Sequence, residues 1–167
     1  MDQPVFYYDL GVPECYLTAE QVTTASGGVP EFEPVLAVDL GLGASELDRI
    51  SIERRARELG IQPLRWPEPW PPDTRTAMLA ATYAKRIGRA VAFSLAAFRQ
   101  AFAGGRDLGA QDTVLIAGAA CEMHPAALLK GIALRSTAQA LAEAAERARR
   151  DGVTELPAVV QPDGSPA

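Results

Sequence analysis

The chain has 167 residues, of which 48% are hydrophobic and 22% are charged, and its formal net charge is -5. This length and composition are typical of one globular domain with its own hydrophobic core. The acidic balance argues against nucleic acid and anionic membranes as partners, because both attract concentrated Lys and Arg. The sequence shows neither a secretory signal pattern nor a membrane-spanning apolar run, so a cytoplasmic protein is expected.

The first quarter of the chain alternates strand and helix patterns. Residues 4 to 10 carry β-branched and aromatic side chains and predict a strand. A helix is expected from Pro13 to Ala25, because proline is tolerated at the first position of a helix. A second strand is expected from Phe32 to Leu40. The capping-box spacing of Ser45–Asp48 then predicts the start of a helix that ends at Gly60.

The middle of the chain is a connector followed by helices. Residues 61 to 72 contain five prolines and two tryptophans, and they predict an extended connector because proline removes backbone donors. From Asp73 almost to Asp151 the pattern predicts five helices, separated by glycine and proline. The second of these is expected to bury one face, formed by Val91, Leu95, Phe98 and Phe102.

The last segment, residues 153 to 160, returns to strand composition. Pro157 lies inside it and cannot donate a ladder hydrogen bond, so it must stand at the start or edge of a strand, where a cis peptide bond is one way to accommodate it. Residues 161 to 164 predict a turn.

The chain has two cysteines and one histidine. Cys15 and Cys121 are far apart and are expected to be free thiols in a reducing compartment. His124 has no ligand cluster around it in the sequence, so no metal site is predicted. Two interpretations of Cys15 stay open: a small buried side chain, or a reactive monothiol.

Four stretches carry a resemblance to a known family: FYYDLGVPECYL at 6 to 17, RWPEPWPPDT at 65 to 74, YAKRIGRAVAFSLAAFRQAFAGGRDL at 83 to 108, and GVTELPAVV at 152 to 160. Their order and spacing resemble the DsbA-like branch of the thioredoxin superfamily. Within that branch, the sequence is most similar to the group of 2-hydroxychromene-2-carboxylate isomerases and kappa-class glutathione transferases.

The resemblance implies an α/β, thioredoxin-like fold with a helical insertion. Residues 1–44 and 152–167 would form the thioredoxin-like core, and residues 45–151 the insertion, with the connector at 61–72. Family members continue into a further strand and helix, so the C-terminal strand and helix are expected to be truncated here. The sheet would then have an exposed edge, which favours self-association.

The same resemblance assigns the residues of a degraded active site. The family presents a Cys or Ser nucleophile at the N-terminus of the first helix, where free N–H groups and the helix dipole stabilise an anion. Val12 stands at this place and cannot react. Cys15 falls at the second position of the family's Cys-x-x-Cys pair and is the one candidate catalytic residue. Glu14 beside it disfavours a thiolate.

Binding residues are also implied. Leu156 and Pro157 resemble the family's cis-proline loop, which offers its backbone to a peptide or to glutathione across a cleft from Val12 and Pro13. Three further residues are candidate binding residues with two open interpretations. Asp73 contacts a ligand or caps a helix. Trp66 and Trp70 line a pocket or pack the connector.

Two functions are therefore predicted. The first is a thiol-disulfide oxidoreductase or glutathione-linked isomerase with a degraded active site, which requires no cofactor but uses glutathione as a ligand. The second is a non-catalytic protein that binds a peptide, glutathione or a small apolar ligand, or that serves as an assembly subunit.

Overall fold

Three strands form one sheet, in the order β2-β1-β3, within residues 3–43 and 47–167, which are the residues that the computed structural model describes. The central strand β1 (Val5–Tyr8) pairs in parallel with β2 (Glu31–Pro34) and antiparallel with β3 (Ala158–Val160). Because parallel strands require a crossover, helix α1 (Pro13–Val22) links β1 to β2.

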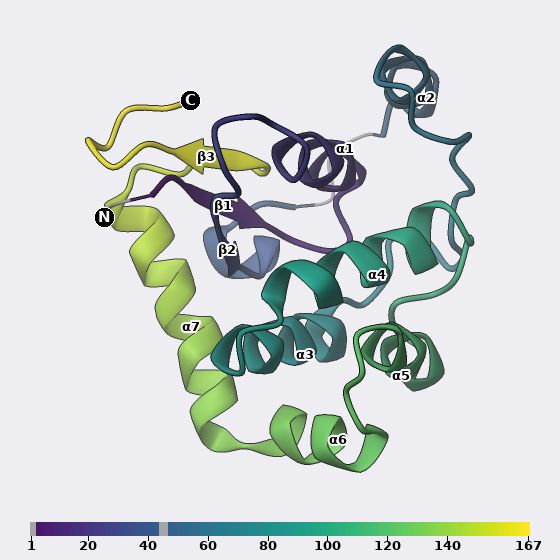
Figure 1. Cartoon of the computed structure of the whole chain (residues 1–167), viewed down its shortest axis with the longest axis vertical. Helices are drawn as coiled ribbons and strands as arrows, with labels where there is room; N and C mark the ends of the chain where they lie inside the picture. The colour runs from purple at the N-terminus through teal and green to yellow at the C-terminus, as the bar shows by residue number, and fades with distance from the viewer. Residues whose placement is uncertain (1–2, 44–46) are drawn as a thin grey trace.

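The helical part of the chain lies between β2 and β3. Figure 1 shows α3 and α4 beside the sheet, α5 and α6 farther away, and α7 leading back from α6 to the sheet. Among the described residues, no helix combines the length and apolar character that crossing a bilayer requires. In chain order the elements are η1, a 3-10 helix (Ala37–Leu40), α2 (Arg49–Glu58), α3 (Arg75–Arg86), α4 (Ala90–Phe102), α5 (Gln111–Ala120), α6 (Pro125–Ala133) and α7 (Arg135–Arg150).

The two faces of β1 contribute to different parts of the core, because side chains alternate along a strand. Phe6 and Tyr8 join the larger cluster, which includes apolar residues of α1, α3 and α4. Val5 and Tyr7 join a smaller cluster with alanines of α7. All four residues of β1 are buried, so the strand that leads into α1 is fixed on both sides.

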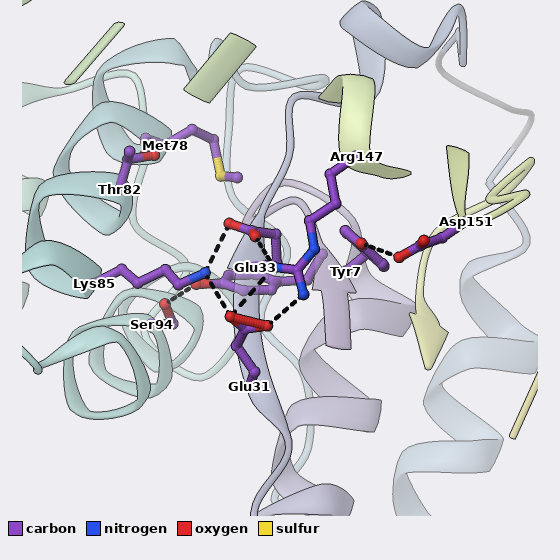
Figure 2. Close-up of polar contacts among 10 residues, drawn as sticks. Tyr7, Glu31, Glu33, Met78, Thr82, Lys85, Ser94, Arg147 and Asp151 are labelled. Carbon is purple, nitrogen blue, oxygen red and sulfur yellow. Dashed lines mark hydrogen bonds and ion pairs between the residues drawn. The ribbon is translucent and has the colours of Figure 1, made fainter. Parts of the chain in front are cut away.

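Four charged side chains link β2 to two helices, and we call them the β2 charge cluster: Glu31, Glu33, Lys85 and Arg147 (Figure 2). The Lys85 Nζ atom lies 3.3 Å from Glu31 Oε1 and 3.0 Å from Glu33 Oε1. Arg147 reaches Glu31 Oε2 at 2.8 Å and Glu33 Oε2 at 2.5 Å. The hydrogen bond from Arg147 lowers the pKa of Glu31. The cluster therefore holds β2, α3 and α7 together through paired charges.

The predicted second strand is wrong beyond its first residues. The strand ends at Pro34, and Ala37–Leu40 forms the 3-10 helix η1. The last contact with β1 is the hydrogen bond from Val35 N to Tyr8 O at 2.9 Å. The Asp9 carboxylate then accepts a hydrogen bond from Ala37 N at 2.9 Å, which draws the chain away from the sheet.

Helix bounds also differ from the predictions. Helix α1 ends at Val22 rather than Ala25, and the Thr23 hydroxyl donates to the carbonyl of Ala19 at 2.9 Å. Helix α2 is capped by Asp48, whose side chain accepts a hydrogen bond from Ser51 N at 3.1 Å. Ser45, which was expected to start the capping box, lies outside the described residues.

The buried face of α4 is rotated from the predicted one. Phe98 and Phe102 are fully buried as expected, but Val91 and Leu95 are only partly buried. Phe93 and small residues such as Ala97 and Ala101 occupy the centre of the interface instead. The prediction considered only large apolar residues. It missed the alanines, which allow α4 to approach its neighbours closely.

The end of the chain folds back on β3. Gly164 N donates to Gln161 O at 2.8 Å, which confirms the predicted turn, and Ala167 N donates to Val159 O at 3.0 Å. Pro166 forms an isolated bridge with Val160. The outer edge of β3 is thus partly covered by residues of the same chain, contrary to the expectation of an exposed edge there; self-association stays a prediction.

Candidate functional site

A cleft of about 230 Å³ opens where β1 passes into α1. Its walls come from the loop before α1, from the region of η1, and from the end of the proline-rich connector. Apolar side chains dominate the walls, and the charged residues among the described lining are Asp9 and Glu14. The lining consists of Asp9, Gly11, Val12, Pro13, Glu14, Ala37, Val38, Leu42, Gly43, Leu47, Trp70, Pro71, Pro72 and Thr74.

Val12 forms the N-terminal boundary of α1, where the resemblance places a nucleophile. Its backbone is extended, with φ -98 and ψ 112, and its side chain makes no capping hydrogen bond. Pro13 follows at the first helical position, where its fixed φ suits the helix. Both residues line the cleft. The N-terminus of α1 therefore carries an apolar side chain at the place where the family carries a nucleophile.

Cys15 lies below this surface and is fully buried. It packs in the larger core cluster and does not line the cleft. Burial raises the pKa of the Cys15 thiol well above its ordinary value, and the charges of Asp9 and Glu14 act in the same direction. The arrangement keeps this thiol protonated and away from solvent.

The second thiol, Cys121, is at the end of α5 and is half-buried. Its Sγ donates to the carbonyl oxygen of Gly118 at 3.3 Å. Burial raises the pKa of Cys121 as well. Both cysteines are free thiols in the structure.

Leu156 and Pro157 precede β3, and the peptide bond between them is cis. The register pairs Tyr7 with Ala158, so these two residues lie at the same end of the sheet as the loop before α1. They do not line the cleft, however; Pro157 lines a separate hollow next to the C-terminal turn. Their role in binding stays a prediction.

The two tryptophans take different positions. Trp70 lines the cleft, whereas Trp66 does not, and the Trp66 Nε1 atom donates to Glu53 Oε1 at 2.7 Å. The Arg49 guanidinium lies 4.9 Å from the centroid of Trp66 and 6.0 Å from that of Trp70. Pocket lining thus applies to Trp70, and packing of the connector to Trp66.

Asp73 is exposed, and its Oδ1 atom accepts a hydrogen bond from Arg75 N at 3.1 Å. Arg75 is the first residue of α3. Of the two interpretations of Asp73, the structure shows the contact expected of a residue that satisfies a helix N-terminus.

Asp9 was not singled out from the sequence, although it is the buried acid of the cleft. Only 4% of its surface is exposed. Its Oδ1 atom accepts from Gly11 N and its Oδ2 atom from Ala37 N, both at 2.9 Å. Burial raises the pKa of Asp9 above its ordinary value, although these two bonds favour the anion. The sequence feature that could have indicated Asp9 is its position: it directly follows the apolar strand and stands two residues before Gly11.

The described residues do not bring three or more His, Cys, Asp or Glu side chains into a group that could hold a metal ion. The arrangement at the cleft offers an apolar surface, one buried carboxyl and one half-buried carboxyl, and no accessible thiol. This suits recognition of a small ligand better than nucleophilic chemistry.

No family model matches the sequence, and no curated protein is significantly similar to it. Solved structures do match. A structure of 2-hydroxychromene-2-carboxylate isomerase aligns with a TM-score of 0.81 and 15% identity, over 93% of this chain and 83% of that one. A probable DsbA oxidoreductase from Streptomyces coelicolor aligns with a TM-score of 0.77 and 16% identity, over 100% of this chain and 83% of that one.

A third structure, of a candidate protein disulfide isomerase from Nitrosomonas europaea, aligns with a TM-score of 0.70 and 17% identity, over 95% of this chain and 84% of that one. At such identities the likeness concerns the backbone. The protein therefore has the predicted thioredoxin-like α/β fold, in the form found in DsbA-like oxidoreductases and 2-hydroxychromene-2-carboxylate isomerase.

Proposed function

We propose that this protein binds a small, largely apolar ligand in the cleft beside α1 and performs no thiol chemistry there. One observation carries the proposal: Val12 occupies the helix N-terminus in the cleft, while Cys15 is fully buried outside it. The fold supplies a binding site, and the groups that would make it an oxidoreductase are replaced or covered.

Thiol-disulfide exchange needs a thiolate that a partner can reach. Cys15 meets neither condition, because burial excludes partners and raises its pKa. In the predicted cytoplasmic location both cysteines would also stay reduced.

A second candidate is a glutathione-linked or peptide-binding function along Leu156 and Pro157. The observation in its favour is that these residues lie at the same end of the sheet as the start of α1. In this alternative the thiol belongs to glutathione, and the positive end of the α1 dipole stabilises it as the anion.

Alkylation of single-thiol variants tests the absence of thiol chemistry. Cys121→Ala leaves only Cys15, and Cys15→Ala leaves only the half-buried Cys121 as a matched comparison. We expect iodoacetamide to spare Cys15 in the folded protein from about pH 7 to about pH 9 and to modify it fully after unfolding. Native-state alkylation of Cys15 at the rate of an exposed thiol, or its protection by glutathione, would contradict the proposal.

A titration with toluene, a neutral apolar molecule with one ring, followed by calorimetry, tests the binding site itself. Val38 lines the cleft and is 72% exposed, so Val38→Asp places a charge at the cleft without disturbing the core. Ile116→Asp is the matched control, because Ile116 is 38% exposed on α5 and does not line the cleft. We expect saturable binding to the parent protein and to Ile116→Asp, but not to Val38→Asp. Equal binding by all three proteins, or by none, rules out this cleft as the site.

A further inference from the structure

The charged residues of the described cleft lining are both acidic. Asp9 is at its floor and Glu14 is half-buried in its wall, and the described lining contains no Lys or Arg. The cation Arg49 lies over the rings of Trp66 and Trp70 and is not part of the lining. A ligand in this cleft therefore meets apolar walls and negative charge.

Another buried carboxylate of the protein has different partners. Glu33 in the β2 charge cluster contacts both Lys85 and Arg147, as Figure 2 shows. Asp9 is more buried than Glu33, with 4% against 9% of its surface exposed. Its hydrogen bonds come from the backbone N–H groups of Gly11 and Ala37 and from the side chain of Thr74 instead of a cationic side chain.

Asp9 can therefore accept a further hydrogen bond. A carboxylate offers about four lone-pair sites, and the bonds from Gly11 N, Ala37 N and the Thr74 side chain leave about one of them free. Burying a carboxylate without a cation costs free energy, which an arriving cation would recover in part. Because Asp9 lines the cleft, a small cationic group can approach it from the cleft side.

We propose that the cleft binds an amine with a compact apolar body, its ammonium group directed at Asp9 and Glu14 and its apolar part packed against Trp70, Leu42 and Leu47. This inference rests on the proposed function and names its ligand class. A volume of about 230 Å³ suits a body of one ring. The ring of Trp70 in the described lining also favours a cation over an anion. Glutathione, which carries more carboxylate than ammonium charge, is a poor match.

The test compares three probes that share a phenyl ring and a short chain: 2-phenylethylamine, 2-phenylethanol and 3-phenylpropanoate. Their affinities for the full chain are measured by calorimetry, with glutathione as a fourth ligand. We expect the amine to bind about tenfold more tightly than the alcohol, and the carboxylate to bind more weakly than both.

Two variants locate the amine. Glu14→Gln should weaken binding of the amine several-fold and leave binding of the alcohol unchanged. Asp9→Asn should remove the preference for the amine; its fold is checked by its unfolding transition, and Glu14→Gln decides the matter if Asp9→Asn does not fold. Asp112→Asn is the control for net charge, because Asp112 is an exposed residue of α5 and does not line the cleft.

The outcomes separate this inference from the proposed function. Equal affinities for the three probes, or tighter binding of the carboxylate or of glutathione, overturn the amine preference while toluene binding still supports the cleft. An amine preference that is unaffected by Glu14→Gln and Asp9→Asn overturns the assigned position. If neither the probes nor toluene bind, the proposed function fails together with its ligand class.

Discussion

Two regions of this molecule bury carboxylates, and they do so in opposite ways. In the β2 charge cluster, Glu31 and Glu33 share two cations, which come from α3 and α7. In the cleft, the partners of Asp9 are the backbone N–H groups of Gly11 and Ala37 and the side chain of Thr74, none of which carries a charge. The first arrangement is complete within the chain. The second leaves room for a charge from outside, and this is why we assign binding to the cleft and structural support to the cluster.

The two regions also connect different parts of the fold. The β2 charge cluster joins residues far apart in the sequence, from β2 to α7, and fixes the helices against the sheet. Asp9 joins the loop before α1 to the start of η1, and so holds two walls of the cleft at a fixed separation. A substitution in the cluster should therefore affect the whole fold, and one in the cleft should affect its ligand.

The largest expected effect comes from breaking the cluster. Arg147→Met leaves Glu31 and Glu33 with Lys85 alone, and we expect the free energy of unfolding to fall by about 2 kcal/mol, less than for a fully buried pair because Arg147 is partly exposed. Urea unfolding measures this loss. Arg150→Met, on the exposed side of the same helix, should change stability by less than about 0.5 kcal/mol. Equal losses in both variants would show that the cluster does not stabilise the fold.

The pH dependence of stability should have opposite signs in the two regions. The pKa of Glu31 is lowered, so its contribution is present above its ordinary pKa of about 4.3 and is lost as the pH falls through its folded-state pKa. The pKa of Asp9 is raised, so its contribution is present below its ordinary pKa of about 3.9 and is lost as the pH rises through its folded-state pKa.

Two variants test these opposite pH dependences. The stability advantage of the parent protein over Glu31→Gln should shrink as the pH falls below about 4, whereas its stability relative to Asp9→Asn should decline as the pH rises above about 4. Urea unfolding at a series of pH values gives both differences. Slopes of the same sign would mean that the two carboxylates do not differ in the way that their partners indicate.

The smallest effect is expected beside the cleft, where a cation is held by aromatic rings instead of carboxylates. Arg49→Met keeps a long apolar side chain over Trp66 and Trp70 but removes the charge, and we expect a loss of about 0.5 kcal/mol in the free energy of unfolding. Arg57→Met, exposed on the same helix, is the control. A loss as large as that of Arg147→Met would remove the distinction between the two regions.

Much of the fold could be predicted because its signals are local. Apolar strands, glycine and proline stops and the connector all depend on neighbouring residues, and the strand that starts after Pro157 followed from the missing N–H group of proline. The end of β2 could not be predicted in this way, because a hydrogen bond between Asp9 and Ala37, far apart in the sequence, redirects the chain.

The site was predictable only in part for the same reason. Val12, Pro13 and Trp70 were expected and do line the cleft. Asp9 was missed, because an acid after a strand is ordinary for a turn, and only the tertiary structure buries it between η1 and the connector. Leu156 and Pro157 reach the expected end of the sheet but do not line the cleft, whose walls opposite α1 come from η1 and the connector; Pro157 lines the hollow next to the C-terminal turn.

The pair of tryptophans gives this protein a built-in optical probe. Trp66 and Trp70 are the only two in the chain, and their rings meet edge to face with centroids 5.8 Å apart. Only Trp70 borders the cleft, while the indole of Trp66 is bonded to Glu53. Tryptophan emission therefore originates from Trp70 in the cleft lining and from its neighbour Trp66, and the arrival or departure of an occupant can be followed without any label.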